Sequence, residues 1–283
     1  MLASAQRLTF VSDVRALRDT EWEFADWLRE NRGKKFGLWG ENAITADVRE
    51  VLDRAAPAPL AVLDAEFDPL RRRKSDVEVQ LIRRACAILD RVRSAFRAAI
   101  TDGKGVRTAG LTAERIAYQE GAQDMRVLAS LHDGGAPEPL QAGQDPRVDP
   151  LLVCLAVRFA GYWAEGLATA TIKPNAALAE ADAALSALIE LARPGLLPPD
   201  KIVETLAVAP DRRLHPCVGW RWSNGVGLSR DESPFLHSGK PGTFQDGDIC
   251  ILQAGFAADD PAGNAIVSAM VRIGADGPEL LWR

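Results

Sequence analysis

The stretch LLVCLAVRFAGYWAEGLATATI, residues 151–172, decides the fold of this chain. An apolar run stops at Ala160-Gly161, and a second run rich in threonine, alanine and leucine follows it. Short β-favouring runs that meet at a glycine predict two antiparallel strands. Such strands point Cys154 and Glu165 into one cleft, and whether these two side chains can hold a metal decides the function.

Helical patterns stand on both sides of this hairpin. Ser75 lies three residues before Glu78, which is a capping-box spacing, and apolar side chains then recur at helical spacing up to Ile100. Further helical runs follow at 111–123, 174–195 and 199–209. The last third of the chain is rich in strand-forming residues. This order predicts an α/β (α+β) domain over residues 69–283 that combines these helices with several antiparallel strands.

Residues 1–68 read as a small α/β domain that precedes the larger one. Helical and strand patterns alternate there, in the order helix 20–31, strand 34–40, helix 45–56 and strand 60–66. No glycine-rich phosphate loop occurs, so a nucleotide-binding role is not expected.

The composition limits the classes of partner. The chain has 283 residues and a formal net charge of -5, without the basic block that favours nucleic acid. No apolar run is long enough to cross a bilayer, and the first residues lack the pattern of a secretory signal. The four cysteines are scattered, which favours reduced thiols. We therefore expect a cytoplasmic protein that binds neither nucleic acid nor membrane.

Four motifs, read in order, resemble one superfamily. They are RRRKSDVEVQLIRRA at 71–85, GYWAE at 161–165, NGVGLSRDESP at 224–234 and DGDICILQAG at 246–255. Together they resemble methionine aminopeptidase, aminopeptidase P, prolidase and creatinase, and the resemblance covers nearly the whole chain. It implies the pita-bread fold for residues 69–283, in which helices cover a curved antiparallel sheet, and a shortened creatinase-type N-terminal domain before it. It also implies a homodimer.

The departures from the family pattern concern the metal ligands. Active members hold two divalent ions with two Asp, one His and two Glu. The positions that match these ligands carry, in order, Cys154, Glu165, Asn224, Gln253 and Ser268. The family's second His is Asp231 here, and the His of the preceding loop is replaced by Glu138.

Charge counting then argues against a metal centre and predicts no cofactor. Two divalent ions about 4 Å apart must be offset by several carboxylates. Only Glu165 remains as a carboxylate, beside a thiol, two amides and a hydroxyl. Amide oxygens are neutral ligands, so a two-metal site is not expected.

Each candidate residue has a functional interpretation and a structural one. The catalytic candidates are Glu165 as base or substrate anchor, Glu138 or His132 as proton shuttle, and Cys154 as a pocket residue or nucleophile. Cys154 has apolar neighbours, which favour a structural role as a small core residue over the role of nucleophile. The substrate-binding candidates are Asn224, Gln253, Asp231, Ser268, His215 and Trp163. Arg221 and Arg230 either hold a carboxylate in the cleft or pair with Asp231 and Glu232 on its rim.

Three functions follow from this reading. The first is a metal-independent enzyme that acts on a small molecule, with creatinase-like hydrolysis or lyase chemistry at a carbon–nitrogen bond. The second is a non-catalytic binding or scaffold protein that keeps the fold. The third is a metal-dependent Xaa-Pro aminopeptidase or prolidase, which the loss of ligands disfavours.

Overall fold

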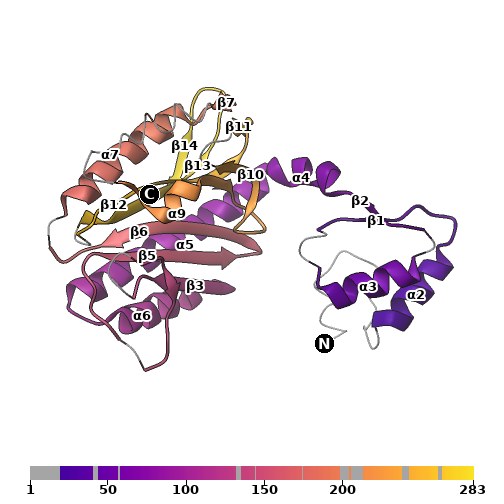
Figure 1. Cartoon of the computed structure of the whole chain (residues 1–283), viewed down its shortest axis with the longest axis horizontal. Coiled ribbons are helices and arrows are strands. Elements are labelled where there is room, and N and C mark those ends of the chain that lie inside the picture. Colours follow the sequence, from indigo (N-terminus) through magenta and orange to yellow (C-terminus); the bar gives the residue numbers. More distant parts are fainter. Residues whose placement is uncertain are drawn as a thin grey trace. The chain divides into compact units, whose positions relative to one another are not determined.

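The computed structural model describes residues 20–40, 44–56, 58–131, 135–143, 145–173, 175–197, 204, 213–237, 242–260 and 263–283. Two compact units make up the chain, Met1–Leu70 and Arg71–Arg283. In Figure 1 the first unit is indigo and the second runs from purple to yellow. No helix among the described residues is both long and apolar enough to cross a membrane.

The described residues of the first unit form helices and a small parallel sheet. Its elements are α2 (Thr20–Glu30), β1 (Gly37–Leu38), α3 (Ala46–Ala55) and β2 (Ala61–Val62). The strands are shorter than the sequence pattern predicts, and the pattern also missed the helix α4 (Asp64–Arg72). Pro69 lies inside α4, and proline disfavours a helix interior, so propensity alone did not indicate this element.

The second unit contains two antiparallel sheets with helices against them. Its helices are α5 (Asp76–Thr101), α6 (Val106–Gln119), α7 (Ala176–Leu191) and α9 (Pro216–Trp220). The first sheet has the order β4-β3-β5-β6, from β3 (Asp124–Ala129), β4 (Glu138–Pro139), β5 (Leu151–Phe159) and β6 (Tyr162–Ala170). The predicted mixed α/β class with antiparallel sheets is confirmed.

The last third of the chain supplies the second sheet. It has the order β10-β9-β12-β13-β14, with β8 beside β12. Its strands are β8 (Arg213–Leu214), β9 (Arg221–Gly225), β10 (Glu232–His237), β12 (Ile249–Ala257), β13 (Ala265–Arg272) and β14 (Glu279–Trp282). A separate pair joins β7 (Gly195–Leu197) to β11 (Gly242–Phe244). The segment 199–209, which the sequence predicts as a helix, lies outside the described residues except for Glu204.

Two local signals from the sequence form as predicted. The Ser75 hydroxyl caps α5 by accepting from the main-chain N–H of Glu78, and the Glu78 carboxylate accepts from the main-chain N–H of Ser75 in return. The β5–β6 hairpin turns at Ala160 and Gly161, where φ is 47° and 89°. A positive φ is easiest for glycine, which explains Gly161 at the second position.

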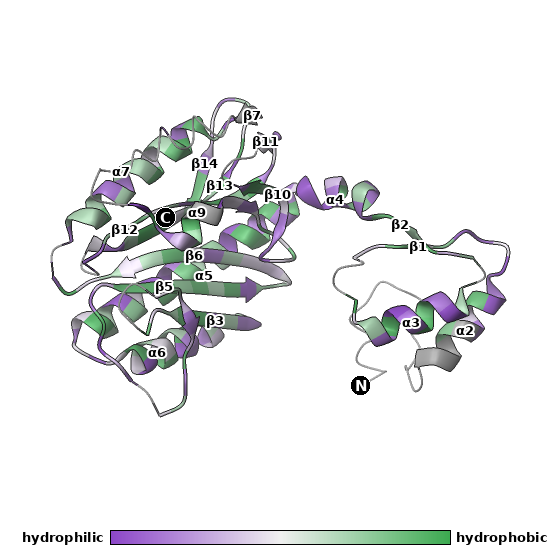
Figure 2. Cartoon of the chain, viewed as in Figure 1, coloured by the Kyte–Doolittle hydropathy of each residue, from purple (hydrophilic) through white to green (hydrophobic). Residues whose placement is uncertain are grey.

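Two buried clusters fill the second unit, and each contains residues of both sheets. The first packs α5 and α6 against β3, β5 and β6, and it includes Ile82, Leu89, Phe96, Leu155 and Val157. The second packs α7 against β12 and β13, and it includes Leu185, Leu188 and Phe256. Figure 1 shows α5 and α6 along the first sheet and α7 along the second, and Figure 2 shows the hydrophobic colour along the central strands.

Hydroxyl side chains join the two sheets where β6 lies beside β13. Thr169 Oγ1 donates to the Ile266 oxygen at 2.9 Å and accepts from the Ile266 N–H at 2.8 Å. Ser268 Oγ donates to the Leu167 oxygen at 3.0 Å and accepts from the Leu167 N–H at 2.7 Å. All four residues are buried. We call this pair of hydroxyls the hydroxyl clasp.

Candidate functional site

Strand register gathers the candidate residues of the first sheet on one face. Cys154 lies opposite Leu167, Ala156 opposite Glu165, and Arg158 opposite Trp163. Because side chains alternate along a strand, Cys154 and Glu165 share a face, as the sequence predicts. The two groups are close enough that the Glu165 charge raises the pKa of the Cys154 thiol.

The Glu165 carboxylate is paired with a guanidinium. Arg230 Nη1 lies 3.0 Å from Glu165 Oε2, and the side chains are 29% and 15% exposed, respectively. Burial raises the pKa of Glu165, and the Arg230 charge opposes that rise. A carboxylate with a raised pKa beside a fixed cation can accept a proton and return it.

Cys154 is a buried thiol. Burial raises its pKa well above the ordinary value, and the neighbouring Glu165 charge raises it further. A thiol in this state holds little thiolate at neutral pH, and thiolate is the nucleophilic form. The geometry therefore favours Cys154 as a pocket residue.

Asn224 fixes the loop that carries Arg230. Its amide Nδ2 donates to the Arg230 oxygen at 2.8 Å and to the Gly225 oxygen at 3.0 Å. The amide is buried in β9. The next residue, Gly225, has to be a glycine, because a Cβ at this position would lie 2.2 Å from the main-chain oxygen of Ser233. Asn224 thus acts on the cleft through the Arg230 main chain.

The other two matched positions lie on adjacent strands. Gln253 of β12 is opposite Ser268 of β13, and both are buried. The Ser268 hydroxyl is already used in the hydroxyl clasp, since it both donates to and accepts from the Leu167 main chain.

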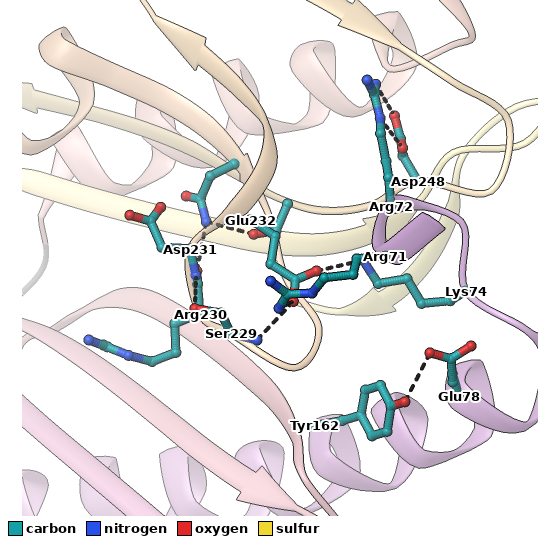
Figure 3. A network of polar contacts seen from close by, with 12 residues as sticks. Arg71, Arg72, Lys74, Glu78, Tyr162, Ser229, Arg230, Asp231, Glu232 and Asp248 are labelled. Atoms are coloured by element: carbon teal, nitrogen blue, oxygen red, sulfur yellow. Dashed lines mark hydrogen bonds and ion pairs between the residues drawn. The ribbon is translucent and has the colours of Figure 1, made fainter. Parts of the chain in front are cut away.

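A buried cluster of charges anchors the loop from the other side (Figure 3). Glu232 accepts from Lys74 Nζ at 2.9 Å, from Arg71 Nη2 at 2.5 Å and from the Ser229 N–H at 2.8 Å. The Lys74 and Glu232 side chains are only 3% and 4% exposed. Figure 3 also shows the Arg230 side chain directed away from this cluster, on the far side of the loop. The ion pair of Glu232 with Lys74 therefore fixes the position of the loop from which the Arg230 side chain extends.

Main-chain bonds complete the positioning of this loop. The Trp163 N–H donates to the Gly227 oxygen at 2.7 Å, and the Val226 N–H donates to the Ile249 oxygen at 3.0 Å. The loop is thus tied to β6 of the first sheet and to β12 of the second.

Asp231 and Arg221 form an ion pair beside the Arg230–Glu165 pair. Asp231 raises the pKa of Glu165 slightly and Arg221 lowers it, so both act on the same site. Arg221 also lies over the Phe235 ring, 5.8 Å from its centre. Of the sequence alternatives for the two arginines, Arg221 pairs with Asp231, whereas Arg230 reaches Glu165.

Three guanidinium groups surround Trp163. Arg126, Arg158 and Arg230 lie 5.5, 6.0 and 5.8 Å from its ring centre. The ring itself is buried. Each distance is within the range of a cation–π contact.

The remaining candidates lie elsewhere or outside the described residues. The β3–β4 register puts Glu138 opposite Ala129, which belongs to the core on the helix-covered face. His215 caps α9 by accepting from the Cys217 N–H at 3.3 Å; burial lowers its pKa. Its Nε2 is buried and makes no hydrogen bond. His132 lies outside the described residues.

Two further observations concern metal ligands and pockets. In the parts of the chain that the structure describes, no three His, Cys, Asp or Glu side chains gather closely enough to hold a metal ion. A pocket of about 530 Å³ lies between α6, β3 and β4; its lining includes Arg107, Glu114, Arg126 and Leu140.

Sequence reasoning missed three parts of this site. It did not predict the contact of Arg230 with Glu165, the two bonds of Lys74 and Arg71 to Glu232, or Arg126 and Arg158 beside Trp163. The alternation of side chains along the hairpin could have placed Arg158 on the same face as Glu165, because the position of the turn fixes which residues of the two strands pair.

The fold is similar to that of several solved peptidases, although no family model and no curated protein matches the sequence. The prolidase of Pyrococcus horikoshii OT3 has a TM-score of 0.75 at 19% identity, covering 94% of this chain and 78% of its own. The X-Pro aminopeptidase of Thermotoga maritima MSB8 has a TM-score of 0.77 at 15% identity, covering 99% and 82%. The Xaa-Pro dipeptidase of Bacillus anthracis has a TM-score of 0.71 at 17% identity, covering 99% and 81%. The chain therefore has the fold of the prolidases and Xaa-Pro aminopeptidases, and the predicted pita-bread fold class is confirmed.

Proposed function

We propose that this chain is a metal-independent enzyme that acts on a small molecule, with Glu165 as general base. The observation that carries the proposal is the contact of Glu165 Oε2 with Arg230 Nη1 at 3.0 Å. A guanidinium stands beside the one carboxylate that the motif positions retain. The reaction class that we favour is creatinase-like hydrolysis or lyase chemistry at a carbon–nitrogen bond.

The state of the other matched residues supports a metal-free site. The Cys154 thiol is held protonated by burial, and the Asn224 amide donates both of its described bonds to main-chain oxygens. The Ser268 hydroxyl bonds the Leu167 main chain. Divalent ions prefer several anionic oxygen or nitrogen ligands, and only Glu165 offers one, already paired with a cation. This donor set does not fit two divalent ions.

The chemistry of Glu165 follows from its environment. For hydrolysis, the carboxylate takes a proton from water while the water oxygen bonds to the substrate carbon. The carbon–nitrogen bond then breaks, and Glu165 delivers the proton to the departing nitrogen. Burial raises the pKa of Glu165 toward the working pH, which favours both transfers. Arg230 holds the Glu165 carboxylate in place during the interval between the two proton transfers.

The proposal is tested by metal analysis together with turnover. We expect protein purified without chelator to contain far less than one metal per chain. Turnover of a panel of amides, guanidino acids and Xaa-Pro dipeptides should not change with chelator. Glu165→Gln should lower kcat by about a hundredfold or more, because one proton-transfer group is removed.

The contrary outcomes separate the alternatives. Two equivalents of manganese, cobalt or zinc per chain, with activity lost to chelator, would favour a metal-dependent Xaa-Pro peptidase. Ligand binding without turnover, unchanged in Glu165→Gln, would favour the non-catalytic binding protein.

A further inference from the structure

The surroundings of Trp163 concentrate positive charge on the cleft face of the first sheet. The register pairs Arg158 with Trp163 across β5 and β6, and it aligns Arg126, Ala156 and Glu165 across β3, β5 and β6. Side chains that are opposite one another share a face. Arg126 and Arg158 therefore point to the same side as Glu165, where Arg230 joins them from its loop.

These guanidinium groups are open to solvent although the ring between them is buried. The Arg126 side chain is 53% exposed, and Arg158 is also exposed. Like charges held around one ring repel each other, which is unfavourable unless counter-charges lie nearby. The arrangement is therefore suited to an anion that arrives from solvent.

The charges of the cluster do not cancel. Four guanidinium groups (Arg126, Arg158, Arg221 and Arg230) face three carboxylates (Asp124, Glu165 and Asp231), which leaves one positive charge. Among the described residues Arg158 forms no ion pair. Its Nε donates only to the main-chain oxygen of Gly161, at 3.3 Å.

We propose that Arg126, Arg158 and Arg230, arranged around Trp163, form a binding site for the carboxylate of a small molecule. The assignment of that molecule as the substrate rests on the proposed function; the binding site itself does not. A single excess charge matches a monoanion, whereas a phosphate dianion would leave the cluster negative. Guanidinium groups suit a carboxylate because they donate two parallel hydrogen bonds.

The site places the bound carboxylate within reach of the reacting group. Arg230 contacts both Trp163 and Glu165, so it connects the anion site to the proposed base. A substrate held by its carboxylate at Arg158 and Arg126 would extend along the sheet face toward Glu165. The proposed substrate is therefore a small carboxylic acid with a carbon–nitrogen bond a few atoms from its carboxylate.

The test measures binding by titration calorimetry at constant ionic strength, with N-acetylglycine as the probe. N-acetylglycinamide, which lacks the charge, and inorganic phosphate serve as comparison ligands. Arg158→Met and Arg126→Met should each weaken N-acetylglycine binding by about tenfold or more, since a charged hydrogen bond is lost. Arg158→Met breaks no ion pair, so folding should be unaffected, which circular dichroism checks.

Arg93→Met is the matched control. Arg93 also lies over a tryptophan, with its guanidinium 4.7 Å from the ring centre of Trp282, but it belongs to helix α5 and does not contact Trp163. The Arg93→Met variant should therefore bind N-acetylglycine as tightly as the unchanged protein does. Equal binding of the neutral amide, tighter binding of phosphate, or an equal loss in Arg93→Met would overturn the proposal.

The two proposals can fail separately. Binding that depends on Arg158, with no turnover of any carboxylic acid, would keep the anion site and remove the enzymatic function. Turnover with a KM that Arg158→Met leaves unchanged would keep the enzyme and remove the anion site.

Discussion

Arg230 and Glu165 are the two residues on which the electrostatics of the cleft depend. Their side chains are 29% and 15% exposed, so the pair is intermediate between a surface salt bridge and a buried one. Surface pairs contribute little, whereas breaking a buried pair leaves an uncompensated charge that costs several kcal/mol.

Arg230→Met should lower the free energy of unfolding by about 1–3 kcal/mol, because Glu165 loses its cation. The double variant Arg230→Met with Glu165→Gln should recover at least half of that loss, since the buried charge is gone. Urea denaturation of the four proteins gives the coupling energy.

Arg221→Met is the control for that cycle. Its partner Asp231 is well exposed, so we expect a change below about 1 kcal/mol. Additive effects of Arg230→Met and Glu165→Gln would show that the ion pair contributes no net interaction.

Two side-chain hydroxyls bridge the seam between the two sheets, where β6 lies beside β13. No main-chain pairing joins β6 to β13 in the described topology; the hydroxyls of Thr169 and Ser268 satisfy main-chain groups of the facing strand instead. Buried main-chain groups that lose a partner cost about 1–3 kcal/mol each.

Thr169→Val should therefore destabilise the second unit by about 1–3 kcal/mol, since valine has the same shape but cannot bond the Ile266 N–H and oxygen. Thr112→Val is the matched control, because the Thr112 hydroxyl bonds the Thr108 oxygen at an exposed position of α6. Chemical denaturation measures both. Equal losses in the two variants would show that the hydroxyl clasp has no special role.

Elements with local signals could be predicted from the sequence, and contacts between distant residues could not. The Ser75–Glu78 cap and the turn at Gly161 depend on residues a few positions apart, so the pattern indicates them directly. The Arg230–Glu165 pair joins residues 65 positions apart through a loop whose path depends on Glu232 and Lys74. The sequence suggested that Arg230 either holds a carboxylate in the cleft or pairs with Asp231 and Glu232 on its rim; the pairing with Glu165 itself was not predicted, because it depends on the path of the folded loop.

The two units of the chain differ in how much apolar surface they bury. Among the described side chains of residues 20–70, the buried apolar ones are Leu28, Leu38 and Leu52, whereas the second unit has two extended core clusters. A small core gives a small free energy of unfolding.

Amide hydrogens of α2 and α3 should consequently exchange with solvent faster than those of α5, β5 and β12. Exchange followed by mass spectrometry tests this at the level of peptides, because amides in regions of low local stability open more often. Equal protection in both units would contradict the expectation and indicate a further contribution to the stability of the first unit.

The predicted homodimer stays a prediction; light scattering of the full chain measures it.

The glycine-rich loop that carries Arg230 is fixed by main-chain bonds to Trp163 and Ile249 and by the buried Glu232. Those bonds do not involve the side chains of Cys154 or Gln253. Mutation can therefore exchange the reactive groups of the cleft one at a time while the loop keeps its path. A frame of this kind lends itself to evolutionary change of chemistry, and equally to protein design.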